Sequence, residues 1–505
     1  MKTMFKLPQL CGMVLLFSCT TDVMPPESNT VTTPPPVGVV QPPVVSPPTN
    51  NNFADVIPDL FPFMDVHKQY FIKEKISYNS SMNIDALFSS KITLPDMGEI
   101  VKSGEKVNMV AIGGSMTAGF RNGGLYRAGQ MTAYPNLVAR QMGITDFQSP
   151  LFGENEANGT GYVQLIDDGS KYPTWREVTN NKATLKAGSP PELSKYEGGI
   201  LNNYAVPEGG LDMIFSKIAC DNCTFYNGKS WTNGIVFASR MSPSPIDIKK
   251  VSLLDQMKKR NVNFFIAEDD FDKFLYSVKD DVMNSLSGYG SYFVNTRQGN
   301  FPKDIKSLMS ENVGASKGVV FTFPIITDLA YFNWYSVVEL KDKANSLTIT
   351  TERYNRKIIL DKMSNFILKP TPTVDALFKN LKKGDNISTT LSKSDLLEEQ
   401  ETISCTNKVR EYNSMIRQKA KDANLALVDL EKIYAQMNIN SYLSSDGFKV
   451  TGGGRGNFFS SDGIYPSAIG QAVIANEVIK SINSTYKSNI PLINLNDYSK
   501  TVGKE

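Results

Sequence analysis

The sequence predicts an α/β domain of three layers, in which helices cover both faces of a doubly wound parallel sheet. Short apolar runs rich in β-branched residues stand at 107–112, 262–266, 318–324 and 425–429, and each has the length of a buried strand. Stretches with helical spacing separate them, most clearly at 401–424. Residues 199–205 are a further, short strand candidate. Strands that alternate with helices form parallel sheets buried on both faces, and about five strands are expected here.

The composition is that of a globular protein. The 505 residues are enough for one large domain or two ordinary ones, and 41% hydrophobic residues supply material for a core. The formal net charge of +2 gives no reason to expect nucleic acid as a partner.

The N-terminus, residues 1–18, has the pattern of an export signal. Two lysines precede the apolar run Leu7–Phe17, which is too short to span a membrane. The run ends in Leu-Phe-Ser-Cys and resembles a bacterial lipobox, with Cys19 as the residue to be lipidated, although Phe17 departs from the usual small or β-branched residue. The alternative is an ordinary secretory signal with an incidental cysteine.

Residues 19–52 are rich in Pro, Thr, Val and Ser, which cannot build a core and favour extended polyproline II. After a lipidated cysteine such a stretch is typical of a tether between a membrane and a folded domain, here expected at 53–505. Asp22, the only charge soon after Cys19, favours neither the cell surface nor the periplasmic face of the membrane.

The first predicted strand ends at Gly113-Gly114 and is followed by Ser115. A polar, Gly-rich break after a buried strand is where α/β folds place their chemistry, so Ser115 is the candidate nucleophile. The spacing differs from the G-x-S-x-G elbow of α/β-hydrolases. The alternative is a purely structural serine that caps the following helix.

Two stretches are expected to elaborate the domain. Residues 145–198 carry many Gly, Pro, Asn and Asp, so we expect long loops at one rim of the site. Residues 331–400 mix charged, polar and aromatic residues, and we expect a partly helical subregion inserted beside the main sheet.

The cysteines and the histidine offer no metal site. Cys220 and Cys223 form a single Cys-x-x-Cys, which lacks a second ligand pair for zinc and is better explained as a local disulfide in an exported chain; Cys405 is then unpaired. His67, the only histidine, lies well before the first strand, and we expect a structural role for it. No cofactor is expected.

The C-terminal stretch Ser460-Ser-Asp-Gly-Ile-Tyr-Pro-Ser467 precedes a predicted helix at 468–482. With the break at Ser115 it resembles the SGNH (GDSL-type) hydrolases, whose first block is Gly-Asp-Ser-x-Thr-x-Gly and whose last is Ser-x-Asp-Gly-x-His-Pro-Ser/Thr. The segments 125–130 and 489–494 resemble SGNH/GDSL-like lipoproteins of Bacteroidota in particular. The resemblance implies a flavodoxin-like fold.

The resemblance also assigns site residues. Ser115 and Asp462 match the family's nucleophile and orienting acid, but Tyr465 stands where the family has histidine, and a tyrosine is a poor base at neutral pH. The glycine that supplies an oxyanion amide falls at Glu208 or Gly209. The asparagine that donates to the oxyanion is replaced by Asp269, and a carboxylate there would repel an oxyanion.

Losses at both the base and the oxyanion donors favour a catalytically inactive protein. We therefore expect an outer-membrane, lipid-anchored SGNH-like lipoprotein that acts as a binding or accessory subunit, for example of an outer-membrane protein complex. The alternative is a serine esterase or acyl hydrolase with an unconventional base, which His67 would supply if it folded onto the site. A third reading is a carbohydrate- or lipid-binding module.

Overall fold

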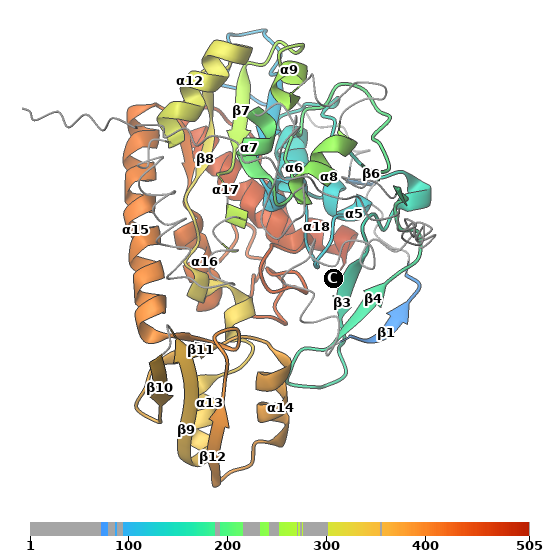
Figure 1. Ribbon diagram of the computed structural model, residues 1–505. Coiled ribbons are helices and arrows are strands. Elements are labelled where there is room, and N and C mark those ends of the chain that lie inside the picture. Colours follow the sequence, from blue (N-terminus) through green and yellow to red (C-terminus); the bar gives the residue numbers. More distant parts are fainter. Residues whose placement is uncertain are drawn as a thin grey trace, which may run out of the picture. The chain divides into compact units, whose positions relative to one another are not determined.

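The computed structural model describes residues 72–78, 86–87, 94–186, 192–215, 233–241, 252–269, 271–272, 275, 301–353 and 356–503. All of them belong to one compact unit within 48–505, shown in Figure 1. The predicted signal peptide and tether, the predicted lipidation site Cys19, His67 and the Cys220–Cys223 pair lie outside the described residues.

The main sheet has four parallel strands, in the order β2 (Met109–Ile112), β7 (Phe264–Ala267), β8 (Lys317–Phe321) and β14 (Ala426–Val428). Every residue of β2 and β7 is buried, as expected for strands covered on both faces. The predicted mixed α/β fold with a parallel sheet is confirmed.

A short segment extends this sheet beyond β2. Ala111 forms a parallel bridge with Asn203, the Ala111 N–H donates to Asn202 O (2.8 Å), and the Tyr204 N–H donates to Ala111 O (2.8 Å). This segment lies within the strand predicted at 199–205. Counted along the chain, the five segments therefore stand in the order 2-1-3-4-5, and the order reverses between β2 and β7.

Two pairs of helices flank the sheet. Helix α12 (Phe301–Val313) packs against α15 (Glu399–Asp422), and α6 (Tyr134–Gln141) packs against α17 (Ala468–Tyr486), which also packs on β14. Figure 1 shows α12 and α15 on the left side of the strands and α17 behind them. Further helices are α4 (Ser115–Ala118), α5 (Arg127–Met131), α7 (Gly210–Phe215), α8 (Asn233–Arg240), α9 (Leu253–Met257), α16 (Leu430–Asn438) and α18 (Leu495–Val502).

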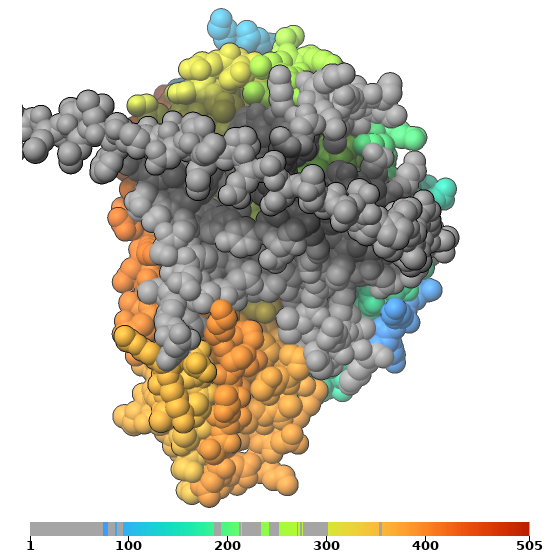
Figure 2. Space-filling model, in the orientation of Figure 1, coloured from blue at the N-terminus to red at the C-terminus, as the bar shows by residue number. Residues whose placement is uncertain are grey.

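A second lobe with its own hydrophobic core lies within the stretch predicted as an insertion at 331–400. Its buried residues run from Tyr335 to Leu396. Figures 1 and 2 show it as a continuous yellow-to-orange body at the lower end of the view. It contains α13 (Val337–Lys343), β9 (Ala344–Arg353), β10 (Arg356–Leu360), β11 (Phe366–Leu368), α14 (Pro372–Asn380), β12 (Asp385–Thr390) and, at its end, β13 (Leu396–Glu398).

The stretch 145–198, expected as loops, contains short strands. They are β3 (Tyr162–Leu165), β4 (Trp175–Val178), β5 (Leu185–Lys186) and β6 (Glu192–Leu193), and β4 pairs with both β3 and β1 (Ile72–Ile76). Strands of two to four residues are too short to show the alternation that would reveal them in the sequence. The indole N–H of Trp175 donates to Ser461 O (2.8 Å), which joins β4 to the C-terminal motif.

Among the described helices, none combines the length and the apolar character that crossing a membrane requires.

Candidate functional site

Ser115 is the first residue of α4, directly after β2 and the Gly113-Gly114 break. The N-cap of α4 is Gly114, and no side chain caps the helix, so Ser115 is not the helix cap. The side chain is completely buried, and its Oγ has no partner in hydrogen-bonding geometry among the residues that the structure describes. The hydroxyl lies near the Asp272 carboxyl; burial raises the pKa of that carboxyl, and the Ser115 hydroxyl offsets part of the rise.

The Asp272 carboxylate contacts Ser115, Glu208 and Tyr465. Its Oδ2 accepts the backbone N–H of Ser115 (2.8 Å) and the backbone N–H of Glu208 (3.1 Å). Its Oδ1 accepts the hydroxyl of Tyr465 (2.6 Å). Two backbone amides that converge on one oxygen are the arrangement that stabilises the oxyanion in acyl transfer. In this protein the two amides already donate to the carboxylate of Asp272.

The glycines of the break make room for two acidic side chains. A Cβ on Gly114 would lie 2.5 Å from Asp272 Oδ2, and a Cβ on Gly113 would lie 2.8 Å from the Cβ of Glu268. Asp272, which follows β7, fills the space beside Gly114 that a side chain at that position would need.

Glu208 supplies the second amide. Its φ of 59° is in the left-handed region, which costs a non-glycine residue about 1 kcal/mol. The turn that holds it begins where the Val206 N–H donates to Gly113 O (2.9 Å). The N–H of Gly209 donates to Val206 O (3.2 Å) instead, so of the two positions that the sequence left open, Glu208 is the one that meets Asp272.

Tyr465 and Ser115 both contact Asp272. Its ring packs edge-on against Phe120, with 5.6 Å between centroids, and its hydroxyl is a donor to a carboxylate. A hydroxyl in that role is not a base for Ser115.

Asp462 holds the C-terminal loop. Its Oδ1 accepts the N–H groups of Ile464 (2.8 Å) and Tyr465 (3.0 Å), and its Oδ2 accepts the N–H of Gly123 (3.2 Å). Burial raises the pKa of this carboxyl. The carboxylate therefore orients the backbone around Tyr465, and its described bonds do not include the tyrosine hydroxyl.

Asp269 is bonded to helix α15. Its Oδ2 accepts the hydroxyl of Tyr412 on α15 (2.6 Å). The acidic residue that the sequence placed among the oxyanion donors is thus present, but it is Asp272, three positions later. The run Glu268-Asp-Asp-Phe-Asp272 directly after a buried strand was the signal that could have pointed to it.

Glu268 is a second buried carboxyl at this site. Its Oε2 accepts the N–H of Thr117 (3.0 Å) and contacts the Thr117 hydroxyl, which is also bonded to the Tyr134 hydroxyl (2.7 Å). Burial, and then the charge of Asp272, raises the pKa of Glu268 to about 8. Burial also raises the pKa of Asp272, while its bonds to Tyr465 and Ser115 lower it.

The two carboxyls are therefore unequal. Three donors stabilise the ionised form of Asp272, whereas Oε1 of Glu268 has no partner among the described residues. Two neighbouring buried carboxyls are not both ionised easily, so near neutral pH the proton resides on Glu268.

Within the described ranges, no cluster of His, Cys, Asp or Glu has the arrangement of a metal site. Comparison with models of protein families, with curated proteins and with solved structures finds no significant match to this chain.

Proposed function

We propose that this protein is a lipid-anchored SGNH hydrolase-like lipoprotein of the outer membrane that binds other molecules and does not hydrolyse esters. In this proposal Cys19 carries the lipid, residues 19–52 form the tether, and the folded domain is an accessory subunit, for example of an outer-membrane protein complex.

One observation carries the non-catalytic part of the proposal. Asp272 accepts both amides that would have to stabilise an oxyanion, the N–H groups of Ser115 and Glu208. A negative charge developing on a substrate would meet a carboxylate where an enzyme needs donors, and removing such donors costs about 10²–10³ in rate. Tyr465, in the histidine position, donates to the same carboxylate.

The strand order supports the flavodoxin-like fold that belongs to this proposal. The order 2-1-3-4-5 is that of flavodoxin-like doubly wound sheets, and ligands of such folds bind where the order reverses. Here the reversal lies between β2 and β7, the strands that precede Ser115 and Asp272.

The test of inactivity uses the full chain from membranes, a serine-directed fluorophosphonate probe and a panel of acyl esters. We expect no labelling and no hydrolysis above that of Ser115→Ala. Labelling that disappears in Ser115→Ala would contradict the proposal.

The anchor is tested separately. Cys19→Ala should move the protein from the membrane to the soluble fraction, and mass spectrometry should find lipid on Cys19 of the wild type. A membrane fraction unchanged by the substitution would exclude this anchor.

The second candidate function is a serine hydrolase in which Asp272 is the base. The observation in its favour is the proximity of the Ser115 hydroxyl to the Asp272 carboxyl. Asp272→Asn distinguishes the hydrolase from the non-catalytic protein. If Asp272 is the base, the wild type is labelled by the probe and Asp272→Asn is not. If the Asp272 carboxylate blocks the site, the wild type is not labelled.

A further inference from the structure

β14 is the last strand of the main sheet, so only one of its edges pairs with another strand. The Thr322 N–H donates to Val428 O (3.0 Å), which shows that the backbone of Val428 faces β8. Successive residues of a strand alternate in direction, so the backbone of Leu427 faces the open edge. The Leu427 carbonyl accepts the Ser481 hydroxyl of α17 (2.7 Å), but its N–H has no hydrogen-bond partner in the described structure.

A groove of about 770 Å³ follows this open edge. It is lined by β14 and the turns at its ends, together with side chains of α15, α16 and α17. Its volume is in the range of ligand sites. Because α15 and α17 belong to the two different helix pairs that flank the sheet, the groove lies between the helix layers, where an added strand would continue the sheet.

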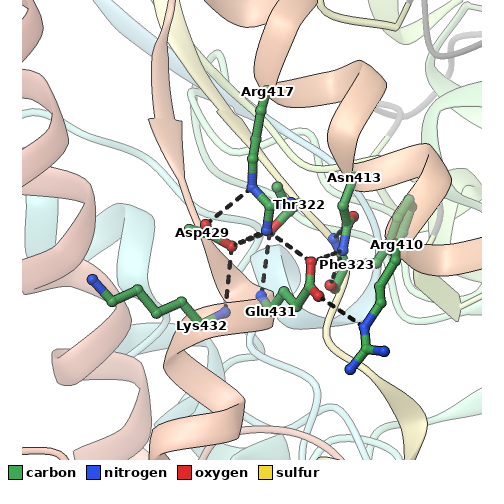
Figure 3. A network of polar contacts seen from close by, with 8 residues as sticks. All are labelled: Thr322, Phe323, Arg410, Asn413, Arg417, Asp429, Glu431 and Lys432. Atoms are coloured by element: carbon green, nitrogen blue, oxygen red, sulfur yellow. Dashed lines mark hydrogen bonds and ion pairs between the residues drawn. The ribbon is translucent and has the colours of Figure 1, made fainter. Parts of the chain in front are cut away.

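Some of the charges that line the groove are already paired. Arg417 of α15 binds Asp429 through two hydrogen bonds (2.8 and 3.1 Å) and Glu431 through a third (2.7 Å), as Figure 3 shows. Lys480 of α17 binds Glu477 (2.7 Å). These paired charges compensate one another, so they add no net charge to the groove.

Two lysines remain. Neither Lys421 of α15 nor Lys432 of α16 has a hydrogen bond or ion pair at Nζ within the described part of the chain, and both are exposed. In Figure 3 the Lys432 side chain extends away from the paired network. The groove therefore carries uncompensated positive charge beside an unsatisfied backbone donor, which favours an anionic occupant.

The rim adds an apolar contact. Leu443 lines the groove, and its side chain is 71% exposed. A strand edge, two unpaired lysines and an exposed aliphatic side chain together match the peptide-recognition mode in which an extended segment adds to a sheet.

We propose that this groove binds an extended acidic peptide segment of a partner protein. The segment adds to the edge of β14, its backbone accepts the N–H of Leu427, its carboxylates pair with Lys421 and Lys432, and an apolar side chain packs on Leu443. This goes beyond the proposed function and does not involve Ser115, so the failure of either proposal leaves the other standing.

The test selects peptides from a displayed random library on the full chain, and measures the binding of the best synthetic peptide by calorimetry. We expect selected sequences rich in Asp and Glu with apolar residues at alternate positions. The double substitution Lys421→Glu/Lys432→Glu should weaken binding at least about tenfold. The matched control Lys357→Glu/Lys383→Glu, which reverses two exposed lysines outside the groove, should change it less than about twofold.

Hydrogen exchange supplies a readout that simple charge attraction would not change. Bound peptide should slow exchange of the Leu427 amide, because strand addition gives that N–H an acceptor. Equal weakening by the control pair, selection of no acidic sequence, or binding that leaves the Leu427 amide unprotected would each overturn the proposal. So would saturation of the groove lysines by inorganic phosphate with no peptide binding, since the site would then be one for small anions.

Discussion

Replacing Tyr465 with phenylalanine tests its hydrogen bond to Asp272, which is central to the proposed structure of the site. The substitution removes one hydroxyl that donates to Asp272 Oδ1 at 2.6 Å and leaves the buried ring in place. A hydrogen bond to a charged group is worth about 1.5–3 kcal/mol, and Oδ1 would be left buried without this donor. We therefore expect the free energy of unfolding to fall by about 2 kcal/mol at neutral pH.

The loss should depend on pH. The Tyr465 hydroxyl lowers the pKa of Asp272, which burial raises, so its removal raises that pKa further. A carboxyl with a raised pKa in the folded state destabilises the protein as pH rises through that pKa. The difference between Tyr465→Phe and the wild type should hence shrink at acid pH, where both carboxyls are protonated, and be largest at alkaline pH.

The assay is urea unfolding of the full chain, followed by circular dichroism at several pH values. Tyr412→Phe is the matched control, because Tyr412 donates to Asp269 at the same distance of 2.6 Å. It should lose comparable stability while leaving the effect of Asp272→Asn unchanged, whereas Tyr465→Phe and Asp272→Asn should be strongly non-additive. A loss below about 0.5 kcal/mol, or simple additivity with Asp272→Asn, would refute the reasoning.

Two further predictions concern buried groups beside Asp272, and a third concerns the ion pairs of Arg417. The pKa of Glu268 in the folded protein is raised to about 8. The free energy of unfolding should therefore decrease as pH rises from the ordinary carboxyl range to about 8. Glu268→Gln should make it depend less on pH, as measured by urea unfolding at several pH values. Gly114→Asp would place a Cβ 2.5 Å from Asp272 Oδ2 and add a buried charge, so it should destabilise by more than about 3 kcal/mol, and Asp272→Gly in the same chain should restore part of the loss. Arg417→Met should destabilise by only about 1 kcal/mol, because the side chain is 36% exposed and its ion pairs are screened; Arg410→Met, whose side chain is 63% exposed, should cost less in the same denaturation assay.

Local patterns in the sequence located the elements that carry the site. The strands predicted at 107–112 and 262–266 are β2 and β7, and the helix predicted at 401–424 is α15. Buried strands and amphipathic helices are visible because their apolar residues recur at short, regular intervals. The short strands within 145–198 were missed because two to four residues cannot display such a pattern.

The sequence also marked Ser115 and Tyr465, through motifs that are contiguous in the chain. Which acidic residue would join them was not visible. Four of the five residues from Glu268 to Asp272 are acidic, and a position that turns toward Ser115 cannot be told from one that turns toward α15 without the path of the backbone.

The sequence by itself therefore determined the class of fold and the strand ends at which its polar residues gather. The tertiary structure alone decided that Asp272 occupies the amides of Ser115 and Glu208. The reason is physical, because the sequence patterns that predict strands and helices extend over only a few neighbouring residues. Asp272 lies 157 positions from Ser115 and 64 positions from Glu208. Only the packing of β2 beside β7 brings these groups within 3.1 Å of one another.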